Sequence, residues 1–255
     1  KDEKVYITGA SKILESNYQL IKSSLPIDKK YDKYLKFYTN GRRIPISYFL
    51  KLLKCLNISD DEFRSIKIIE KKSKEDKAIP IFLPLTKEMM RLLGYIASEG
   101  RIQNTCVKIS NKNEEILTDI YNCAKIFNPK LNKRRSKSEL VIYSKLFVKI
   151  LKSLGLYGNS EKKRAPWILF HVNEILLSEY FRAYYEGDGC VEKRCITATT
   201  KSKNLANDHL YHLLRLGIIG RIEVKKLKNT KYRSIYYQIT ISGRENLEKF
   251  AQIGF

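Results

Sequence analysis

Two nine-residue stretches decide the fold of this chain: LLGYIASEG at Leu92–Gly100 and FRAYYEGDG at Phe181–Gly189. They lie 89 positions apart, and each is a helix-compatible apolar run that ends in an acidic residue followed directly by glycine. When one stretch is placed on the other, Glu99 pairs with Asp188. A repeat of this length predicts two copies of one supersecondary unit, and therefore a molecule with a pseudo-twofold axis.

The segments around the two stretches repeat one order of elements, αββαββα. In the first half, apolar periodicity and turn residues predict helices near 87–99, 113–127 and 145–154, and strands at 101–103, 105–110, 132–135 and 140–144. In the second half, they predict helices at 174–188, 202–216 and 244–252, and strands at 190–192, 195–200, 220–228 and 234–242. The expected fold class is therefore α+β, with antiparallel sheets.

A charged linker separates this repeat region from the N-terminal third of the chain. It covers residues 71–77 and is followed by a proline-flanked stretch at 79–84. Before the linker the pattern is mainly helical, and apolar residues at three- and four-residue steps predict one face of a helix: Ile46, Phe49, Leu50, Leu53 and Leu56. We therefore expect three domains, at residues 1–83, 84–160 and 161–255.

The composition is strongly basic. Lys and Arg outnumber Asp and Glu by 49 to 27, a formal net charge of +22, which favours a polyanionic partner and nucleic acid above all. A membrane surface is the competing interpretation, but no apolar run approaches the roughly 18 residues that span a bilayer. The first residues lack the pattern of a signal peptide and the five cysteines form no C-x-x-C pair. We therefore expect an intracellular protein without a disulfide framework or a zinc site.

Small residues lie four apart in both stretches: Gly94 with Ser98, and Ala183 with Gly187. Each pair makes a flat patch that another helix can approach closely, so we expect the two helices to pack together with their C-terminal ends adjacent. The carboxylates at those ends would repel each other unless they share a cation, and Mg²⁺ suits such ligands and promotes phosphodiester hydrolysis. The alternative is that each acid–glycine pair is only a helix C-terminus with a left-handed glycine.

Both stretches resemble the two motifs of LAGLIDADG homing endonucleases of the single-chain, two-repeat kind. The segment KRAPWI at 163–168 is similar to the linker before the second motif in archaeal members, and TTKSKNLA at 199–206 with LLRLGII at 213–219 is similar to the stretch after it. The resemblance covers residues 84–255. It implies a monomer that sets a saddle of two antiparallel sheets on the DNA major groove. It also implies cleavage of both strands across the minor groove, with short 3′ overhangs.

The resemblance also implies a metal site for Mg²⁺ or Mn²⁺. In the family, the acid before the last glycine of each motif binds the metal ions, and these acids are Glu99 and Asp188 here. The main-chain carbonyls of Ser98 and Gly187 are implied as helpers. The first motif has Glu where Asp is more common, which retains the carboxylate but changes its reach.

Basic residues on the sheets act near the cleaved phosphates in this family. Lys193 and Lys225 are the candidates to stabilise charge or orient water; the alternative is that both are ordinary phosphate contacts or solvated residues. Candidates to bind base edges face outward on the predicted strands: Lys108, Thr197, Thr199, Arg221, Arg233, Tyr236 and Gln238. A basic cluster is expected to bind phosphates: Lys133, Arg134, Arg135 and Lys137.

The N-terminal third offers a second DNA-binding candidate. GRRIP at Gly41–Pro45, with the helix to Leu56, is similar to the closing part of a helix-turn-helix of the Cro/repressor type, so Arg42 and Arg43 are candidate DNA contacts. A small helical docking domain is the alternative.

We therefore expect a Mg²⁺-dependent, site-specific endonuclease acting on double-stranded DNA. An RNA-binding intron maturase and a catalytically silent DNA-binding regulator on the same fold are the alternatives. His209 and His212 lie three apart on a predicted helix without a third ligand, so we expect them to be surface or structural residues.

Overall fold

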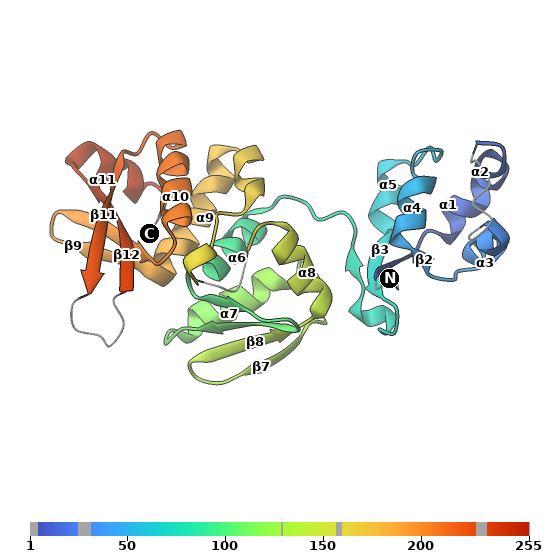
Figure 1. The fold of residues 1–255 in the computed structure, drawn as a ribbon, viewed down its shortest axis with the longest axis horizontal. Coiled ribbons are helices and arrows are strands. Elements are labelled where there is room, and N and C mark those ends of the chain that lie inside the picture. Colours follow the sequence, from blue (N-terminus) through green and yellow to red (C-terminus); the bar gives the residue numbers. More distant parts are fainter. Residues whose placement is uncertain (1–4, 25–31, 129, 157–159, 228–233, 255) are drawn as a thin grey trace. The chain divides into compact units, whose positions relative to one another are not determined.

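In the computed structural model of this chain, the described residues are 5–24, 32–128, 130–156, 160–227 and 234–254 (Figure 1). They form α-helices and antiparallel sheets, which confirms the predicted α+β class. The chain divides into two compact units. The N-terminal unit is Lys1–Pro84 with Phe127–Lys130, and the C-terminal unit is Leu85–Ile126 with Leu131–Phe255.

The first half of the C-terminal unit begins with helix α6 (Lys87–Ser98), whose N-cap Thr86 accepts a hydrogen bond from the Met89 N–H. Four strands follow, in the sheet order β5-β6-β8-β7: β5 (Gly100–Ile102), β6 (Cys106–Ser110), β7 (Asn132–Arg135) and β8 (Glu139–Tyr143). Helix α7 (Glu114–Ala124) connects the two hairpins, and α8 (Lys145–Ser153) closes the half. The predicted αββαββα order is confirmed here.

The second half has the same order. After the short 3-10 turns η3 (Ser160–Lys162) and η4 (Trp167–His171) come α9 (Glu174–Asp188), β9 (Gly189–Glu192), β10 (Cys195–Thr200), α10 (Lys203–Arg215), β11 (Gly220–Leu227), β12 (Ser234–Ser242) and α11 (Arg244–Ala251). The sheet order is β11-β12-β10-β9, which matches the first sheet strand for strand. Both halves therefore have one topology.

The strand register carries the same repeat as the sequence. Gly100 lies opposite Ile109 in the first sheet, and Gly189 lies opposite Ala198 in the second. Both members of the second pair stand 89 positions after their counterparts. The repeat therefore extends from the motif helices into the first hairpin of each sheet.

The two motif helices pack against each other through their small residues, and Figure 1 shows α6 and α9 side by side. A Cβ added to Gly94 would lie 2.3 Å from the Tyr180 carbonyl oxygen and 3.0 Å from the Ala183 Cβ. A Cβ added to Gly187 would lie 2.3 Å from the Ser98 Oγ. Glycine is thus required for this close approach. Helices α7 and α8 pack on the first sheet, and α10 and α11 pack on the second.

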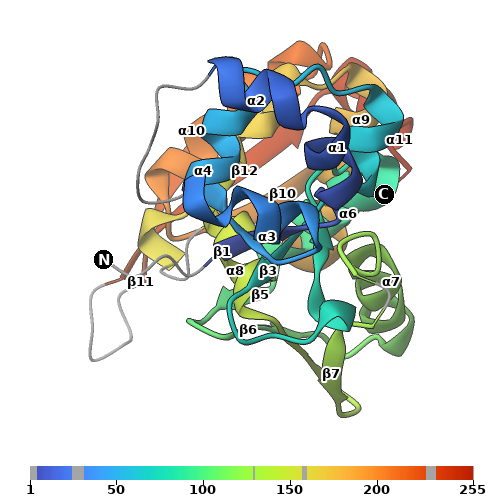
Figure 2. The same ribbon diagram turned by 90° about the vertical axis from the view of Figure 1, so that its right-hand side faces the viewer.

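The N-terminal unit has five α-helices in its described residues: α1 (Ser11–Ser16), α2 (Tyr18–Ser24), α3 (Leu35–Thr39), α4 (Ile46–Leu52) and α5 (Asp60–Ser65). Figure 2 shows α1 to α4 in blue. The unit also contains a small antiparallel sheet, in the order β2-β1-β3-β4, of β1 (Val5–Thr8), β2 (Ile44–Pro45), β3 (Lys67–Glu70) and β4 (Ile79–Pro80). The 3-10 turns η1 (Asp32–Tyr34) and η2 (Glu75–Lys77) complete it. The helical pattern of the sequence did not predict this sheet.

Helix α4 also differs from the expected helix. It ends at Leu52 and not near Leu56, and Leu50 is 53% exposed. The buried face consists of Tyr48, Phe49 and Leu52. The Tyr48 ring packs on the Tyr38 ring at 5.8 Å between centroids, which turns this side of the helix toward the core and Leu50 outward.

Candidate active site

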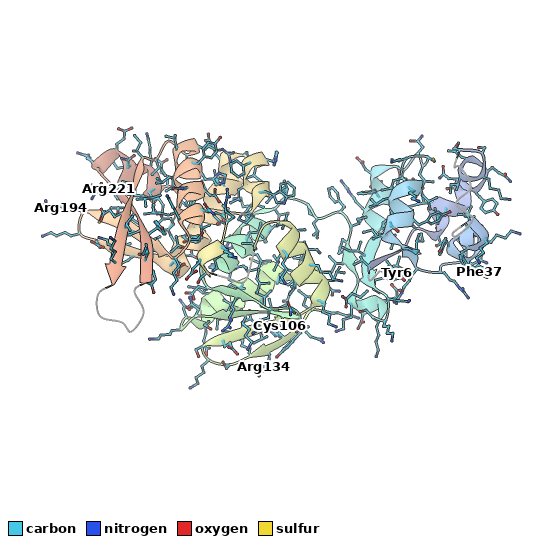
Figure 3. All side chains as sticks on the ribbon, viewed as in Figure 1. Tyr6, Phe37, Cys106, Arg134, Arg194 and Arg221 are labelled. Carbon is cyan, nitrogen blue, oxygen red and sulfur yellow. The ribbon has the colours of Figure 1, made fainter. Side chains whose placement is uncertain are left out.

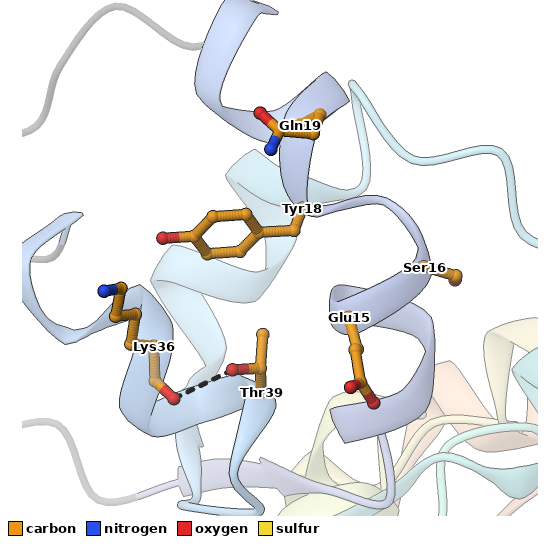
Figure 4. A pocket seen from close by; sticks show the side chains of 6 residues that line it. All are labelled: Glu15, Ser16, Tyr18, Gln19, Lys36 and Thr39. Atoms are coloured by element: carbon orange, nitrogen blue, oxygen red, sulfur yellow. Dashed lines mark hydrogen bonds between the residues drawn. The ribbon is translucent and has the colours of Figure 1, made fainter.

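The N-terminal unit contains an open pocket lined by polar side chains (Figure 4). Its lining residues are Glu15, Ser16, Tyr18, Gln19, Lys36 and Thr39. The hydroxyl of Thr39 donates to the carbonyl oxygen of Lys36 at 2.8 Å. Since Glu15 is the single carboxylate in this lining, the pocket does not match the paired-acid site that the sequence predicts.

The C-terminal ends of α6 and α9 meet each other. A Cβ added to Gly187 would lie 2.9 Å from the Glu99 Cγ, so the second motif lies directly against the acid of the first. Glu99 and Asp188 are both half-buried, and the negative charge of Asp188 acts on Glu99. The structure therefore brings the two motif acids into one site.

Burial sets the protonation of this acid pair. It raises the pKa of Glu99 to about 7, with a further contribution from the Asp188 charge, while a hydrogen bond from Asn111 and the charge of Lys163 oppose the shift. Burial also raises the pKa of Asp188 to about 6, against the charge of Lys163. Two carboxyl groups with raised pKa values at one place are typical of a functional site.

Lys163 is the cation of this site. Its Nζ donates hydrogen bonds to the carbonyl oxygens of Ala97 (2.7 Å) and Ser98 (3.1 Å) at the end of α6. Burial lowers the pKa of Lys163, while the charges of Asp188 and Glu99 raise it. In sequence, Lys163 lies in the segment that resembles the linker before the second motif, and no pattern there predicts a role for it.

Asn111 orients one of the two acids. It follows β6 directly, and its Nδ2 donates to the Glu99 Oε1 at 3.3 Å. The Asn111 Oδ1 in turn accepts the Asn113 N–H at 2.8 Å, which fixes the amide. Asn111 was not predicted from the sequence either, because a loop asparagine before a helix is expected to serve only as a turn residue.

The donors at this site fit a hard divalent cation. Two carboxylates and the carbonyl ends of α6 and α9 offer oxygen ligands only, which Mg²⁺ and Mn²⁺ prefer. The Ser98 carbonyl oxygen accepts a hydrogen bond from the Lys163 ammonium, and its second lone pair is available to a cation. In the described part of the chain, no group of three or more His, Cys, Asp or Glu residues could hold a metal. Further ligands would therefore come from water and from a phosphate.

The left-handed glycines that the alternative interpretation expects are absent from both motifs. Among the described residues, the glycines with positive φ are Gly9, Gly41, Gly155, Gly217, Gly243 and Gly254. Neither Gly100 nor Gly189 is among them; Gly189 has a φ of −80°. Gly100 is required instead by close packing, since a Cβ there would lie 2.4 Å from the Ile96 carbonyl oxygen.

The two lysines proposed to assist catalysis lie away from the acid pair. Lys193 is exposed at the turn after β9, so the whole of that four-residue strand, roughly 13 Å long, lies between it and Asp188. Lys225 lies on β11, the strand farthest from β9 in the sheet, and its Nζ donates to the Glu223 Oε2 at 2.8 Å. Extended strands carried these lysines away, which their spacing in the sequence did not reveal.

The first sheet presents a basic row on the face opposite its core. Arg101 pairs with Lys108, which pairs with Val141, which pairs with Arg134, so the three basic side chains lie on one face across four strands. Arg134 also forms an ion pair with Glu139 at 3.0 Å and is labelled in Figure 3. Arg101 was not among the residues predicted from the sequence to bind DNA.

Two members of the predicted phosphate-binding cluster face the other way. Lys133 lies over the Tyr121 ring of α7 at 3.7 Å from its centroid. Arg135 donates to the Thr118 Oγ1 and to the Glu114 carbonyl oxygen, both on α7. Lys137 is exposed between β7 and β8. The alternation of side chains along β7 therefore splits a cluster that is continuous in sequence.

The second sheet has its predicted outward residues on one face. In the strand register, Thr240 on β12 lies between Arg221 on β11 and Thr197 on β10. Gln238 lies opposite Thr199, and Tyr236 is two residues before Gln238 on β12. Thr199 and Arg221 are exposed, and Arg221 is labelled in Figure 3. Thr197 is only 4% exposed, so little of it is available to a partner. Arg233 lies outside the described residues.

The two candidate arginines of the N-terminal unit, Arg42 and Arg43, have different surroundings. Arg43 is held within the unit, because its guanidinium forms an ion pair with Glu75 and donates to the carbonyl oxygens of Glu70, Lys71 and Ser73. This leaves little of Arg43 for a DNA contact. Arg42 instead lies over the ring of Phe37 at 4.6 Å from its centroid.

His209 and His212 are structural and do not lie at the surface. Both are fully buried, and the Tyr180 hydroxyl lies 2.9 Å from the His209 Nε2. Burial lowers the pKa of His209 to about 3 and that of His212 to about 4, so both are neutral at physiological pH.

Within the described ranges, no helix has the length and apolar character needed to cross a bilayer.

Comparison with known proteins places this fold in a family. A family model described as a LAGLIDADG-like domain matches residues 176–253, which include the second motif and nearly all of its half. This part of the chain belongs to the LAGLIDADG family. The crystal structure of I-DmoI in complex with DNA and Mn has a TM-score of 0.51 at 16% identity, over 67% of this chain and 97% of that one. This match shows the shared fold.

Relatives at the sequence level have unrelated names. A replication factor C small subunit from Methanocaldococcus jannaschii is 30% identical over 235 residues, which cover 84% of this chain and 12% of that protein. An A-type ATP synthase subunit from Pyrococcus abyssi is 32% identical over 192 residues, which cover 71% of this chain and 18% of that protein. The chain therefore spans less than a fifth of the length of either relative.

Proposed function

We propose that this LAGLIDADG protein is a site-specific DNA endonuclease that cuts both strands with Mg²⁺ or Mn²⁺. The observation that carries the proposal is the half-buried pair of Glu99 and Asp188 at the joined ends of α6 and α9, with Lys163 beside them. Because one chain supplies both acids, a monomer suffices for both strands. The solved I-DmoI complexes with DNA and Mn or Mg support the choice of DNA and of a divalent cation.

In this proposal Glu99 and Asp188 hold the metal through their carboxylates, helped by the carbonyls of Ser98 and Gly187. The bound cation would polarise the scissile phosphate and lower the pKa of the attacking water. Asn111 restricts the orientation of the Glu99 carboxylate through its hydrogen bond. The raised pKa values mean that both acids must lose protons before they bind the cation.

Lys163 supplies a fixed positive charge next to the acids. Its ammonium sits on the carbonyl oxygens of Ala97 and Ser98, so it needs no rearrangement to stabilise negative charge on a phosphate bound at the acid pair. We propose Lys163, in place of Lys193 and Lys225, as the catalytic lysine.

The DNA would lie on the outward faces of the two sheets. Arg101, Lys108 and Arg134 offer cations on the first sheet, and Arg221 and Gln238 offer groups suited to guanine and adenine edges on the second. Lys137, Thr199 and Tyr236 remain candidate contacts.

The N-terminal unit would add a separate contact through the outer side of η1 and α3. Tyr34 and Phe37 are 37% and 44% exposed, their ring centroids are 6.1 Å apart, and Lys33 and Arg42 lie over their faces. Exposed aromatic rings with cations upon them suit a nucleic acid partner. We propose this surface, together with Arg42, in place of Arg43.

The relatives suggest where the target lies. A segment similar to this chain occurs within a replication factor C small subunit and within an A-type ATP synthase subunit. Because these two proteins have different names and functions, we infer that the shared segment is not what performs either function. We infer that it is a mobile insertion, as an intein or an intron product, whose target is the host gene without the insertion. A duplex that joins the host sequences on either side of this reading frame is therefore the substrate to test.

The experiment compares cleavage of that duplex by the wild type, Glu99→Gln and Asp188→Asn in the presence of Mg²⁺. Each substitution should lower the cleavage rate about a thousandfold or more, because charge stabilisation by a bound cation contributes several kcal/mol. The dissociation constant for the duplex, measured in Ca²⁺, should change little. Undiminished cutting by either variant would refute the assignment. A wild type that binds but never cuts would favour a silent DNA-binding protein, and tight binding of RNA alone would favour a maturase.

A further inference from the structure

The segment that carries Lys163 has no regular secondary structure of its own. Residues 163–166 lie between η3 and η4 and belong to no helix or strand. The Lys163 ammonium nevertheless lies at the carbonyl oxygens of Ala97 and Ser98. Something other than a helix or a strand must therefore fix the backbone from which this side chain extends.

Helix α10 and its N-cap provide that support. The hydroxyl of Ser202 donates to the Lys163 carbonyl oxygen at 2.6 Å, and the Ser202 Oγ also accepts the Leu205 N–H as the helix cap. Less than two turns further along, the Asp208 Oδ2 accepts the Ala165 N–H at 3.1 Å. Residues on both sides of Arg164 are thus bound to one rigid helix.

Arg164 completes the set of contacts between residues 163–165 and α10, which we call the clamp. Its Nε and Nη2 donate to the two carboxylate oxygens of Asp208 at 2.7 and 2.8 Å, a bidentate pair. Such charge-assisted pairs fix direction as well as distance. Asp208 therefore makes three hydrogen bonds to two successive residues, although it is only 8% exposed and lies 20 positions beyond Asp188 in sequence.

We propose that Asp208, together with Ser202, is a positioning residue of the cleavage site. It touches neither of the motif acids in the contacts described above, and it acts by holding residues 163–165 so that the Lys163 ammonium stays beside the acid pair. This proposal rests on the proposed function in one respect, the catalytic role of Lys163. Its structural part, the placement of Lys163 by α10, stands apart from any activity.

The experiment uses the full chain with Asp208→Ala, Asp208→Asn and Ser202→Ala. A matched control is Asp119→Ala, which removes the partly exposed Arg91–Asp119 ion pair of the first half. Three quantities are measured: the single-turnover cleavage rate, the dissociation constant for the duplex, and the rate at which an acylating reagent modifies Lys163, followed by mass spectrometry of its peptide. Thermal melting reports whether each variant is folded.

We expect Asp208→Ala to lower the cleavage rate by about 10- to 100-fold, the effect of a displacement near 1 Å in a catalytic group. Affinity for the duplex should stay within about threefold, a change below 1 kcal/mol. Acylation of Lys163 should speed up in Asp208→Ala and stay at the wild-type rate in Asp119→Ala. In a Lys163→Met background, Asp208→Ala should cause no further loss of cleavage, since two residues that act through one group are not additive.

Two results would overturn the proposal. One is an equal loss of cleavage from Asp208→Ala with and without Lys163, which would mean a general effect on the fold. The other is an unchanged acylation rate of Lys163 in all three variants. If Asp208→Ala fails to fold, Asp208→Asn and Ser202→Ala decide in its place. If the wild type cuts no duplex, the proposed function fails, and the acylation rates still test the clamp.

Discussion

Glu99 and Asp188 repel each other at the junction of two helix ends, and Lys163 offsets only part of that repulsion. The acids are therefore held in an unfavourable state when no cation is bound, which is the usual condition of a site built to receive one. Residues chosen for stability alone would not place two half-buried carboxyl groups together.

Burial of Glu99, together with the repulsion from Asp188, predicts a pH-dependent stability of the metal-free protein. The pKa of Glu99 is raised from 4.5 to about 7 in the folded state, so the folded state holds the proton more tightly than the unfolded state does. The resulting stabilisation is present below about pH 4.5 and is lost as the pH rises through about 7. Glu99→Gln should therefore raise the melting temperature in EDTA more at about pH 8 than at about pH 5. Equal changes at both pH values would contradict this account.

At this scale the sequence predicted the two acids but not their partners. Glu99 and Asp188 each occupy the same place in a repeated pattern, so each supports the other. Lys163 and Asn111 have no counterpart in the repeat, and they reach the site from a linker and a loop. The contacts of Lys163 join residues 65 or 66 positions apart, and such contacts leave no periodic pattern in the sequence.

The elements of the C-terminal unit were predictable because each carries its own local pattern. Caps, apolar periodicity and turn residues gave the order and the approximate ends of its helices and strands. Which face of the sheet each side chain of a short strand points to was not predictable in the same way. Lys133 and Arg135 point toward α7 while Arg134 points away, which depends on the register of the hairpin. The two-residue strands β2 and β4 are too short to show any period.

The contact between α6 and α9 predicts the effect of a single methyl group. In Gly94→Ala the new Cβ would lie 2.3 Å from the backbone oxygen of Tyr180, which cannot move without shifting α9. Overpacking of this kind costs about 1–3 kcal/mol, which exceeds the gain of about 1 kcal/mol from replacing glycine in a helix. We expect a lower melting temperature for the variant, by calorimetry.

A second substitution checks the cause. Adding Ala183→Gly relieves the 3.0 Å contact with the Ala183 Cβ but not the contact with the Tyr180 oxygen. Because Ala183→Gly alone costs about 1 kcal/mol in a helix, the comparison is a double-mutant cycle: Gly94→Ala should destabilise the Ala183→Gly protein less than it destabilises the wild type, but should still destabilise it. A more stable Gly94→Ala protein would mean that the helices are not closely packed at this point.

The aromatic surface of η1 and α3 predicts a contribution to DNA binding. Tyr34→Ala and Phe37→Ala should each weaken binding of the target duplex about fivefold or more, since contacts of bases or sugars with aromatic rings contribute about 1–3 kcal/mol. Leu50→Ala is the control, because Leu50 is at least as exposed as these rings but has no aromatic face for a base or a cation. Equal losses for all three variants, by fluorescence anisotropy, would remove the assignment.

At the scale of the whole molecule, charge dominates. The net charge of +22 and the basic row of the first sheet predict that binding is driven by release of counterions from DNA. Affinity for the duplex should fall by about a thousandfold or more between roughly 50 and 200 mM salt. A shallow dependence would count against the sheet faces as the DNA surface. Arg101→Ala should make the dependence less steep by about one counterion.

The central claim is that the two LAGLIDADG helices create one metal site from acids that are far apart in sequence. The most direct measurement is the anomalous scattering of Mn²⁺ in crystals of the protein bound to its duplex. We predict density for Mn²⁺ in contact with carboxylate oxygens of both Glu99 and Asp188, and its loss in a variant that carries Glu99→Gln and Asp188→Asn together. Mn²⁺ bound elsewhere, with both acids uncoordinated, would contradict the account.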